Sequence, residues 1–209
     1  MTSAPAADWR RLVEWCSAHG AVITDGQLDQ LRAYFDVLQI WNRKLALVSQ
    51  SEPAQIICKH FADSLFVASH CPEDEPIVDL GSGAGFPGLP IAIARPNSRV
   101  CLIESRGKKA SFLEFASQSA AIRNAVILNR RIESVVIERS FRGSFAVAIG
   151  RALTTAPRFF ELAQGFLRPG GRTLAMRSVH EPWTLPPGIE EIRYVLPDGS
   201  PRRLLIACH

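Results

Sequence analysis

One segment, Val78-Asp79-Leu80-Gly81-Ser82-Gly83-Ala84-Gly85-Phe86-Pro87-Gly88, constrains the fold more than any other part of the chain. It follows an apolar run and leads into a stretch that favours a helix. This is the arrangement of a ligand-binding loop at the carboxyl edge of an open α/β sheet. Read from Asp79 the spacing is D-x-G-x-G-x-G, and read from Gly83 it is G-x-G-x-x-G, the dinucleotide fingerprint. The glycines therefore predict a nucleoside ligand without choosing its class.

The pattern on either side of this loop predicts a doubly wound α/β fold. Short β-type runs alternate with helical stretches, and two final runs lack a helix-length gap between them, which predicts an antiparallel hairpin at one edge. The expected strands are Ile77–Leu80, Arg99–Glu104, Ala125–Leu128, Phe145–Ile149, Arg172–Met176, Ile192–Leu196 and Arg203–Ala207. The expected helices lie near 88–95, 107–121, 131–138 and 157–167. We predict a Rossmann-like, mostly parallel sheet in residues 73–209.

Residues 1–72 are expected to form an N-terminal helical extension. Between Thr24 and Leu47 the apolar residues recur at intervals of three and four, as in an amphipathic helix. A further helix is expected to begin near Pro53, with Ile56, Ile57, Phe61, Leu65 and Ala68 on its buried side. The breaker-rich stretch 71–76 separates this extension from the alternating part of the chain.

Composition excludes several classes of protein. The chain has 209 residues, of which 47% are hydrophobic and 21% charged, so it is neither disordered nor fibrous. No apolar stretch approaches the roughly 18 residues of a membrane span, and the first residues lack a secretory pattern. Five cysteines without CxxC spacing argue against a disulfide framework or a structural metal. We expect a cytoplasmic protein, a monomer, with no membrane partner and no metal.

Two acidic residues refine the ligand. Asp79 precedes the first glycine by two residues, where its charge would repel a diphosphate and attract the sulfonium and amino group of S-adenosylmethionine. Pro87 removes an N–H that a phosphate could use. Glu104, at the end of the second strand, is placed to accept hydrogen bonds from ribose hydroxyls of either ligand. These residues favour S-adenosylmethionine over NAD(P).

Arg151 follows the fourth strand, where such methyltransferases usually place their chemistry. The acid- or amide-proline-proline-aromatic pattern of enzymes that methylate exocyclic amines is missing there, as is the Pro-Cys of enzymes that methylate pyrimidine C5. Because a cation cannot act as a general base, the acceptor should be a lone pair that carries no proton, such as purine N7.

The motifs together resemble the bacterial family of 16S ribosomal RNA guanine-N7 methyltransferases, ribosomal small-subunit methyltransferase G, also called glucose-inhibited division protein B. The resemblance extends from about Trp41 to about Ile206. It is carried by Trp41-Asn42, His60-x-x-Asp63-Ser64-Leu65, the block DLGSGAGFPGLPIAIARP at 79–96, Glu104-Ser105-x-Gly107-Lys108-Lys109, Phe112-Leu113, Arg151-Ala152 and Leu167-x-Pro169-Gly170-Gly171. Relatives usually have Ser where Gly150 stands, and Lys-Gly where Arg177-Ser178 stands.

The resemblance implies methyl transfer from S-adenosylmethionine to N7 of one guanine in 16S ribosomal RNA, either free or in the small ribosomal subunit. It assigns cofactor binding to Asp79, Gly81, Gly83, Gly85, Phe86, Glu104, Ser105, Ile132, Glu133 and Arg151. It assigns substrate positioning to Arg151, His60 and Asp63, with no general base. It assigns RNA binding to Lys108, Lys109, Ser64 and Arg177.

Several alternatives stay open at the level of sequence. His60 and Asp63, three residues apart on one helix face, could pair merely to dock the extension. Lys108 and Lys109 could be an ordinary solvated helix end. The rival functions are an NAD(P)-dependent oxidoreductase, a methyltransferase of small molecules, and a nucleoside-binding regulator without catalysis.

Overall fold

The computed structural model describes residues 4–50, 52–181 and 186–209, and its centre is a seven-stranded sheet of order β3-β2-β1-β4-β5-β7-β6. The strands are β1 (Ile77–Leu80), β2 (Val100–Ile103), β3 (Ala125–Leu128), β4 (Phe145–Arg151), β5 (Leu167–Ser178), β6 (Ile189–Val195) and β7 (Pro201–Cys208). The first five strands are parallel, whereas β7 pairs antiparallel with both β5 and β6. The predicted mostly parallel sheet with an antiparallel edge hairpin is confirmed.

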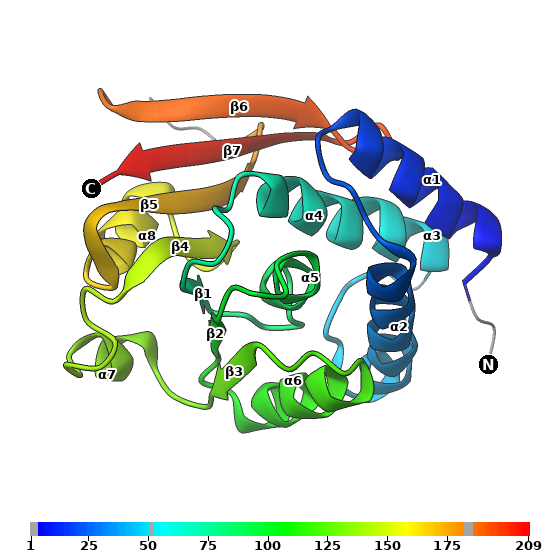
Figure 1. The fold of residues 1–209 in the computed structure, drawn as a ribbon, viewed down its shortest axis with the longest axis horizontal. Helices are drawn as coiled ribbons and strands as arrows, with labels where there is room; N and C mark the ends of the chain where they lie inside the picture. The colour runs from blue at the N-terminus through cyan, green and yellow to red at the C-terminus, as the bar shows by residue number, and fades with distance from the viewer. Residues whose placement is uncertain (1–3, 51, 182–185) are drawn as a thin grey trace.

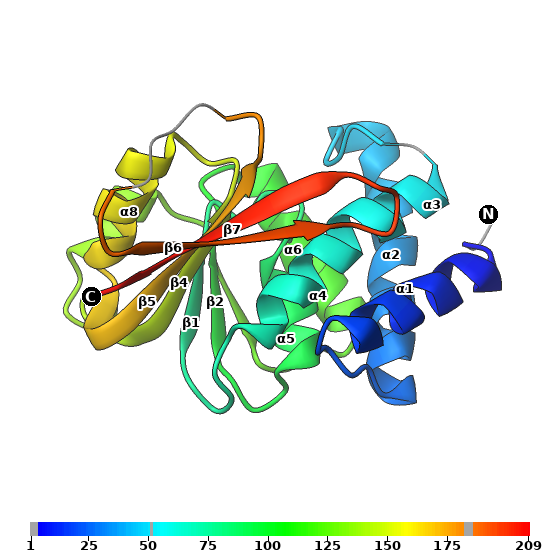
Figure 2. The same ribbon diagram turned by 90° about the horizontal axis from the view of Figure 1, so that it is seen from above.

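Helices cover both faces of this sheet, as Figures 1 and 2 show from two directions. They are α1 (Ala6–Ala18), α2 (Asp25–Leu45), α3 (Pro53–Ile56), the π-helix η1 (Ile57–Phe61), α4 (Ala62–Ser69), α5 (Gly88–Ala94), α6 (Gly107–Ser119), α7 (Ile132–Val136) and α8 (Ala156–Gln164). In Figure 2, α8 lies on one side of the sheet and α4, α5 and α6 on the other, with α1 and α2 farther out. Residues of α7 share a hydrophobic core with α8. The crossover helices thus produce two layers around the parallel strands.

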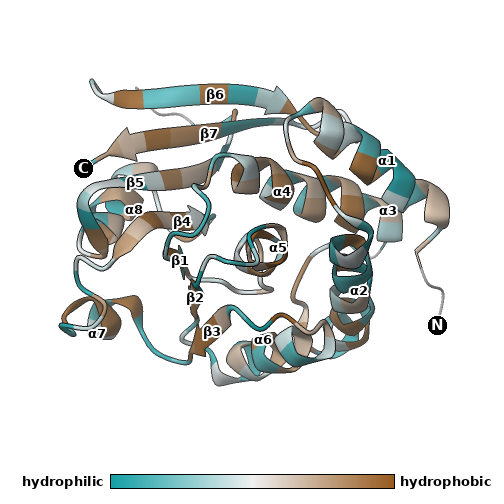
Figure 3. Cartoon of the chain, viewed as in Figure 1, coloured by the Kyte–Doolittle hydropathy of each residue, from teal (hydrophilic) through white to brown (hydrophobic). Residues whose placement is uncertain are grey.

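The N-terminal helices share a hydrophobic core with one face of the sheet. That core joins Trp9, Leu38 and Phe61 of the extension to residues of α5, α6 and the strands. The other face packs on α7 and α8 through a separate core that includes Phe159. In Figure 3, teal and brown segments follow one another along β6, as expected of an edge strand with one side in water. The expected boundary at residue 72 stays a prediction.

The helix expected between Thr24 and Leu47 is α2, and its start has a local cause. Thr24 is its N-cap and forms a capping box with Gln27, so backbone N–H groups at the first turn have partners. Its end is Ala46, with a left-handed backbone (φ 45°). The N–H of Val48 then donates to Oδ1 of Asn42 at 2.9 Å, which holds the following loop against the helix.

The helix expected near Pro53 is interrupted by a turn of π-helix, which the sequence did not predict. Its expected buried residues, Ile56, Ile57, Phe61, Leu65 and Ala68, are all buried. The π-turn contains His60, and such turns are frequent at functional sites. Among the helices of the described residues, none combines the length and apolarity needed to cross a membrane.

Candidate active site

The glycine loop lines a cavity of about 530 Å³ at the carboxyl edge of the sheet. Its lining comprises Gly81, Gly83, Ile103, Glu104, Ser105, Arg106, Lys109, Arg130, Arg131, Ile132, Glu133, Arg151, Ala152 and Leu153. Gly81 and Gly83 have φ of 75° and 57°, which residues with a side chain rarely adopt. A Cβ on Gly81 would lie 2.5 Å from Leu153 Cδ1, so the loop and the residues after β4 approach each other closely because residue 81 is glycine.

Two backbone N–H groups hold the Glu104 carboxylate at this cavity. Its Oε2 accepts the N–H of Gly83 at 2.9 Å and its Oε1 accepts the N–H of Arg106 at 2.7 Å. The carboxylate is therefore fixed at the cavity wall and keeps lone pairs for the hydroxyls of a ribose. Ile103, Ile132 and Leu153 provide apolar surface for a base. The predicted cluster of Gly81, Gly83, Glu104, Ser105, Ile132, Glu133 and Arg151 is thus gathered around one cavity.

Asp79 lies behind the loop instead of facing this cavity. It is 1% exposed, and its Oδ2 accepts the N–H of Gly88 at 3.1 Å. Burial raises the pKa of the Asp79 carboxyl to about 7, against hydrogen bonds from Ser82 and Gly88 that lower it. Its carboxylate thus fixes the loop at the start of α5, and the expectation that Asp79 attracts the charge of the ligand stays a prediction.

The loop amides give a better reason against a diphosphate. The N–H groups of Gly81 and Ser82 donate to the Ile103 carbonyl, that of Gly85 donates to Ser82, and that of Gly83 donates to Glu104. A dinucleotide places its diphosphate on free loop amides. Here those amides are already paired, and the residues fit a nucleoside without phosphate.

Gly85 and Phe86 also lie away from the cavity lining. The Phe86 ring is 4% exposed and stacks on the His60 ring, with centroids 5.1 Å apart. The Arg151 guanidinium also lies over the Phe86 ring, with its central carbon 5.3 Å from the ring centroid. Beside Gly85, Tyr34 of α2 donates to the Ala84 carbonyl at 2.5 Å. Gly85 and Phe86 thus join the loop to the extension, and their expected cofactor contacts stay predictions.

A second cavity, of about 540 Å³, adjoins the first across Arg151 and Ala152, which line both. Its lining comprises Leu47, Val48, Ser49, Gln50, Lys59, His60, Asp63, Arg151, Ala152, Met176, Arg177, Ser178, Glu181 and Arg202. We name the first cavity, beside the glycine loop, the nucleoside cavity, and the second the acceptor cavity. The fold thus places a dividing wall, with Arg151 in it, between two spaces of similar size.

His60 and Asp63 each contact the Arg151 guanidinium. Arg151 Nη1 donates to His60 Nδ1 at 2.8 Å and lies 3.7 Å from Asp63 Oδ2. Since Nδ1 accepts, Nε2 carries the proton and donates to Gln50 Oε1 at 2.7 Å. Burial, followed by the charge of Arg151, lowers the pKa of His60 to about 3. The neutral His60 ring therefore orients Arg151. His60 and Asp63, expected as a pair, are joined through Arg151 into a group of three side chains.

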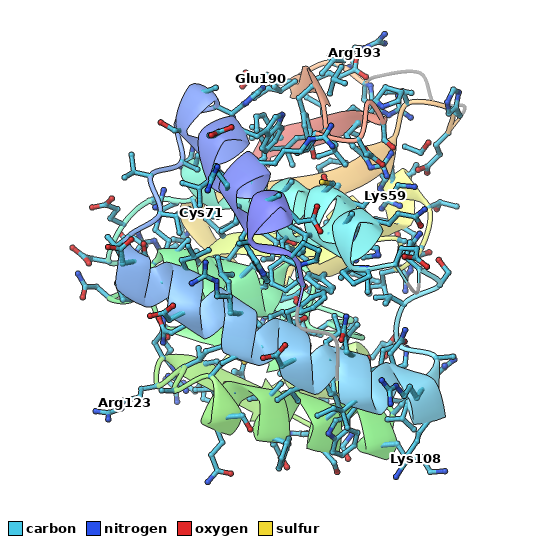
Figure 4. All side chains as sticks on the ribbon, turned by 90° about the vertical axis from the view of Figure 1, so that its right-hand side faces the viewer. Lys59, Cys71, Lys108, Arg123, Glu190 and Arg193 are labelled. Atoms are coloured by element: carbon cyan, nitrogen blue, oxygen red, sulfur yellow. The ribbon has the colours of Figure 1, made fainter. Side chains whose placement is uncertain are left out.

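The RNA-binding residues expected from the sequence have different surroundings. Ser64 is 0% exposed and donates to the His60 carbonyl, so the expectation that it touches RNA is corrected. Arg177 is 6% exposed and donates to the Thr154 carbonyl at 2.5 Å, which holds the loop after β4. Lys109 lines the nucleoside cavity, whereas Lys108 is exposed and projects outward in Figure 4.

Residues that the sequence did not suggest complete the acceptor side. Gln50 fixes the tautomer of His60, Tyr194 donates to Asp63, and Arg202 lines the cavity from the edge hairpin. For Tyr194 and Arg202, the sequence predicted only the two hairpin strands, without a role for either side chain. Within the described residues, no group of three or more His, Cys, Asp or Glu side chains could hold a metal ion.

The fold and the nucleoside cavity define the class: this is the fold of S-adenosylmethionine-dependent methyltransferases. A methyltransferase of this kind from Aquifex aeolicus has a TM-score of 0.54 at 12% identity, over 74% of this chain and 93% of that one. The structure of P. horikoshii TYW2 in complex with MeSAdo has a TM-score of 0.53 at 14% identity, over 71% of this chain and 62% of that one.

Sequence comparison gives the family. The family model for rRNA small subunit methyltransferase G matches residues 27–183. Proteins named ribosomal RNA small subunit methyltransferase G are 32% identical in Acetivibrio thermocellus, over 79% of this chain and 69% of that protein, and 31% identical in Caldanaerobacter subterraneus, over 92% and 82%. The chain belongs to the rRNA small subunit methyltransferase G family, as the motifs predicted.

Proposed function

We propose that this protein transfers the methyl group of S-adenosylmethionine to N7 of a guanine in small-subunit ribosomal RNA. The observation that carries the proposal is the pair of cavities meeting at Arg151 and Ala152. One suits a nucleoside cofactor and the other is large enough for an extruded base. The family names of the relatives support the substrate, and the side chains around Arg151 support N7 as the acceptor atom.

The side chains beside the wall are poorly suited to removing a proton. Arg151 is a cation, and His60 accepts from Arg151 through Nδ1 and donates through Nε2. One oxygen of Asp63 accepts from Tyr194 at 2.5 Å. Guanine N7 carries no proton, so this arrangement can position the acceptor without a general base. The remaining task is orientation.

When bound, S-adenosylmethionine supplies a methyl group on a sulfonium. Glu104 and the Gly81–Gly83 backbone would hold the nucleoside part, and Ile132 would face the base. Arg151 would contact O6 beside N7, or a phosphate of the RNA. Methylation at N7 makes the base a cation, and Asp63, 3.7 Å from Arg151, balances the positive charge already present there. The chain's residues thus orient the acceptor and manage its charge.

The direct test uses purified protein, S-adenosylmethionine with a labelled methyl group, and ribosomal RNA from cells that lack the protein. We expect label in one guanine of the small-subunit RNA and strand scission there after borohydride and aniline, which report N7 methylation. Free RNA and assembled subunits are tested in parallel. Label in another base or atom, or binding of NADH in place of S-adenosylmethionine, would contradict the proposal.

A further inference from the structure

The edge hairpin reaches the acceptor cavity although it lies outside the matched residues 27–183. Tyr194 of β6 is the register partner of Arg202 of β7, so both side chains leave the hairpin on the same face. That face packs on α4, where Asp63 is 2% exposed. The hairpin therefore brings a hydroxyl and a guanidinium to one buried carboxylate.

Asp63 depends on these partners for its charge. Its Oδ1 accepts from the Tyr194 hydroxyl at 2.5 Å, and its Oδ2 lies 3.7 Å from Arg151 Nη1 and 3.8 Å from Arg202 Nε. Burial raises the pKa of Asp63, while Arg151, the Tyr194 hydrogen bond and Arg202 lower it. The charge of Arg151 is the largest of these supports for the ionised form, and the Tyr194 hydrogen bond is the next and the shortest contact.

Tyr194 is well placed to give this support. Its ring stacks on Phe66 with centroids 3.8 Å apart, which fixes the hydroxyl toward Asp63. Burial, followed by the charge of Asp63, raises the pKa of Tyr194, so it stays a donor at every working pH. Away from Asp63, Trp15 Nε1 donates to the Val195 carbonyl at 3.2 Å and holds the hairpin to α1.

We propose that Tyr194 is a positioning residue for methyl transfer: its hydroxyl keeps Asp63 ionised and aimed at Arg151. Asp63 and the neutral His60 then both hold Nη1 of Arg151, whose guanidinium lies over the Phe86 ring. A protonated Asp63 would release Arg151 and leave its charge unbalanced where a cationic product forms. This inference rests on the proposed function.

The test is Tyr194→Phe, which keeps the ring and its stacking but removes the donor. The rate of methyl transfer at saturating substrates is followed from pH 5.5 to pH 9. Because a hydrogen bond to a charged group stabilises it enough to move a pKa by about one to two pH units, we expect the acid limb to move upward by that amount. Activity at alkaline pH should stay within a few-fold of the wild type, and S-adenosylmethionine affinity should not change.

Two comparisons separate this role from simple support of the hairpin. Trp15→Phe loosens the hairpin without touching Asp63, so it should lower stability and leave the acid limb in place. Asp63→Asn should lower the rate at every pH and abolish the limb. Adding Tyr194→Phe to Asp63→Asn should then cost nothing more. An unmoved limb in Tyr194→Phe, or additive losses in the double variant, would overturn the inference.

Carboxyl ¹³C NMR of Asp63 gives a readout that does not need activity. Tyr194→Phe should raise the pKa of Asp63 by a similar amount. If the wild type fails to methylate RNA while this pKa moves, the proposed function fails and the contact to Asp63 stands. If the pKa does not move, the role of Tyr194 is disproved whatever the enzyme methylates.

Discussion

Arg151 is the residue at which β4, the π-turn and the glycine loop meet. Replacing it with Ala removes the contacts to His60 and Asp63 and the group beside the acceptor. We expect methyl transfer to fall by roughly 100-fold or more, since misplacing a substrate by about 1 Å costs that much. S-adenosylmethionine affinity, measured by calorimetry, should change only a few-fold because Glu104 and the loop remain.

Arg151→Lys is the matched control. It keeps the charge but loses the planar fork that bonds His60 and faces Asp63, so it should recover only part of the rate. Loss of S-adenosylmethionine binding in Arg151→Ala, with normal turnover at saturating cofactor, would make Arg151 a cofactor residue alone.

His60 makes a separate prediction about pH and stability. Its pKa is lowered from 6.5 to about 3 in the fold, so its contribution is present above pH 6.5 and is lost as the pH falls toward 3. Relative to His60→Gln, which cannot be protonated, the wild type should lose on the order of 1 kcal/mol of unfolding free energy per pH unit below 6.5. Urea unfolding at pH 7.5, 6.5 and 5.5 measures the difference.

Asp79 acts in the opposite direction. Its pKa is raised from 3.8 to about 7, so its contribution is present at low pH and is lost as the pH rises from about 4 to 7. Both proteins in the His60→Gln comparison retain Asp79, so its effect cancels in the difference. A difference that stays constant with pH would contradict the neutral, buried state of His60.

The residues of the site divide into those that sequence could place and those that it could not. Gly81, Gly83 and Glu104 were predictable because a motif fixes backbone conformation and the ends of parallel strands meet at one edge. The burial of the Asp79 and Phe86 side chains could not be predicted, since side-chain direction depends on packing against α5 and η1. Tyr194 could not be foreseen because its partner Asp63 is 131 residues away in sequence.

At the scale of elements, β4 and α8 pack so closely that position 150 has room only for glycine. A Cβ on Gly150 would lie 2.3 Å from Phe159 Cε2 and 2.8 Å from its Cζ. Phe159 is 0% exposed, and its ring fills the space that a side chain at position 150 would need. Gly150→Ser should destabilise the protein by about 1–3 kcal/mol through overpacking.

The compensating change is Phe159→Leu, which removes the two nearest ring atoms. The double variant Gly150→Ser with Phe159→Leu should regain stability relative to the sum of the single changes, as measured by thermal unfolding. Strict additivity would show that Phe159 is not the obstacle.

Element type was easier to predict than element detail. The strands and crossover helices were predicted because periodicity reports burial on one or two faces directly. The extent of β5 was not predicted, because Pro169 and Gly170 discourage a strand. The strand nevertheless begins at Leu167. The π-turn at 57–61 was also missed, because its apolar spacing is compatible with an ordinary α-helix.

Charge is a property of the whole molecule. Residues 1–98 contain 7 Lys and Arg against 11 Asp and Glu, whereas residues 99–209 contain 17 against 9. The fold brings part of this excess to the nucleoside cavity, whose lining includes Arg106, Lys109, Arg130 and Arg131. A cationic cofactor gains nothing from these positive charges. The phosphates of an RNA that crosses the cavity mouth would be attracted by them.

RNA affinity measured at several salt concentrations tests this reading. Lys109→Ala and Arg131→Ala should each reduce the log–log salt slope by about one, while S-adenosylmethionine affinity stays unchanged. Arg123→Ala is the matched control, because Arg123 lies beyond the opposite end of α6 from Lys108 in Figure 4 and does not line the nucleoside cavity. An equal reduction of the salt slope in the Arg123 variant would mean that RNA is attracted by net charge alone. An unchanged salt slope in the Lys109 and Arg131 variants would mean that RNA does not cross this cavity.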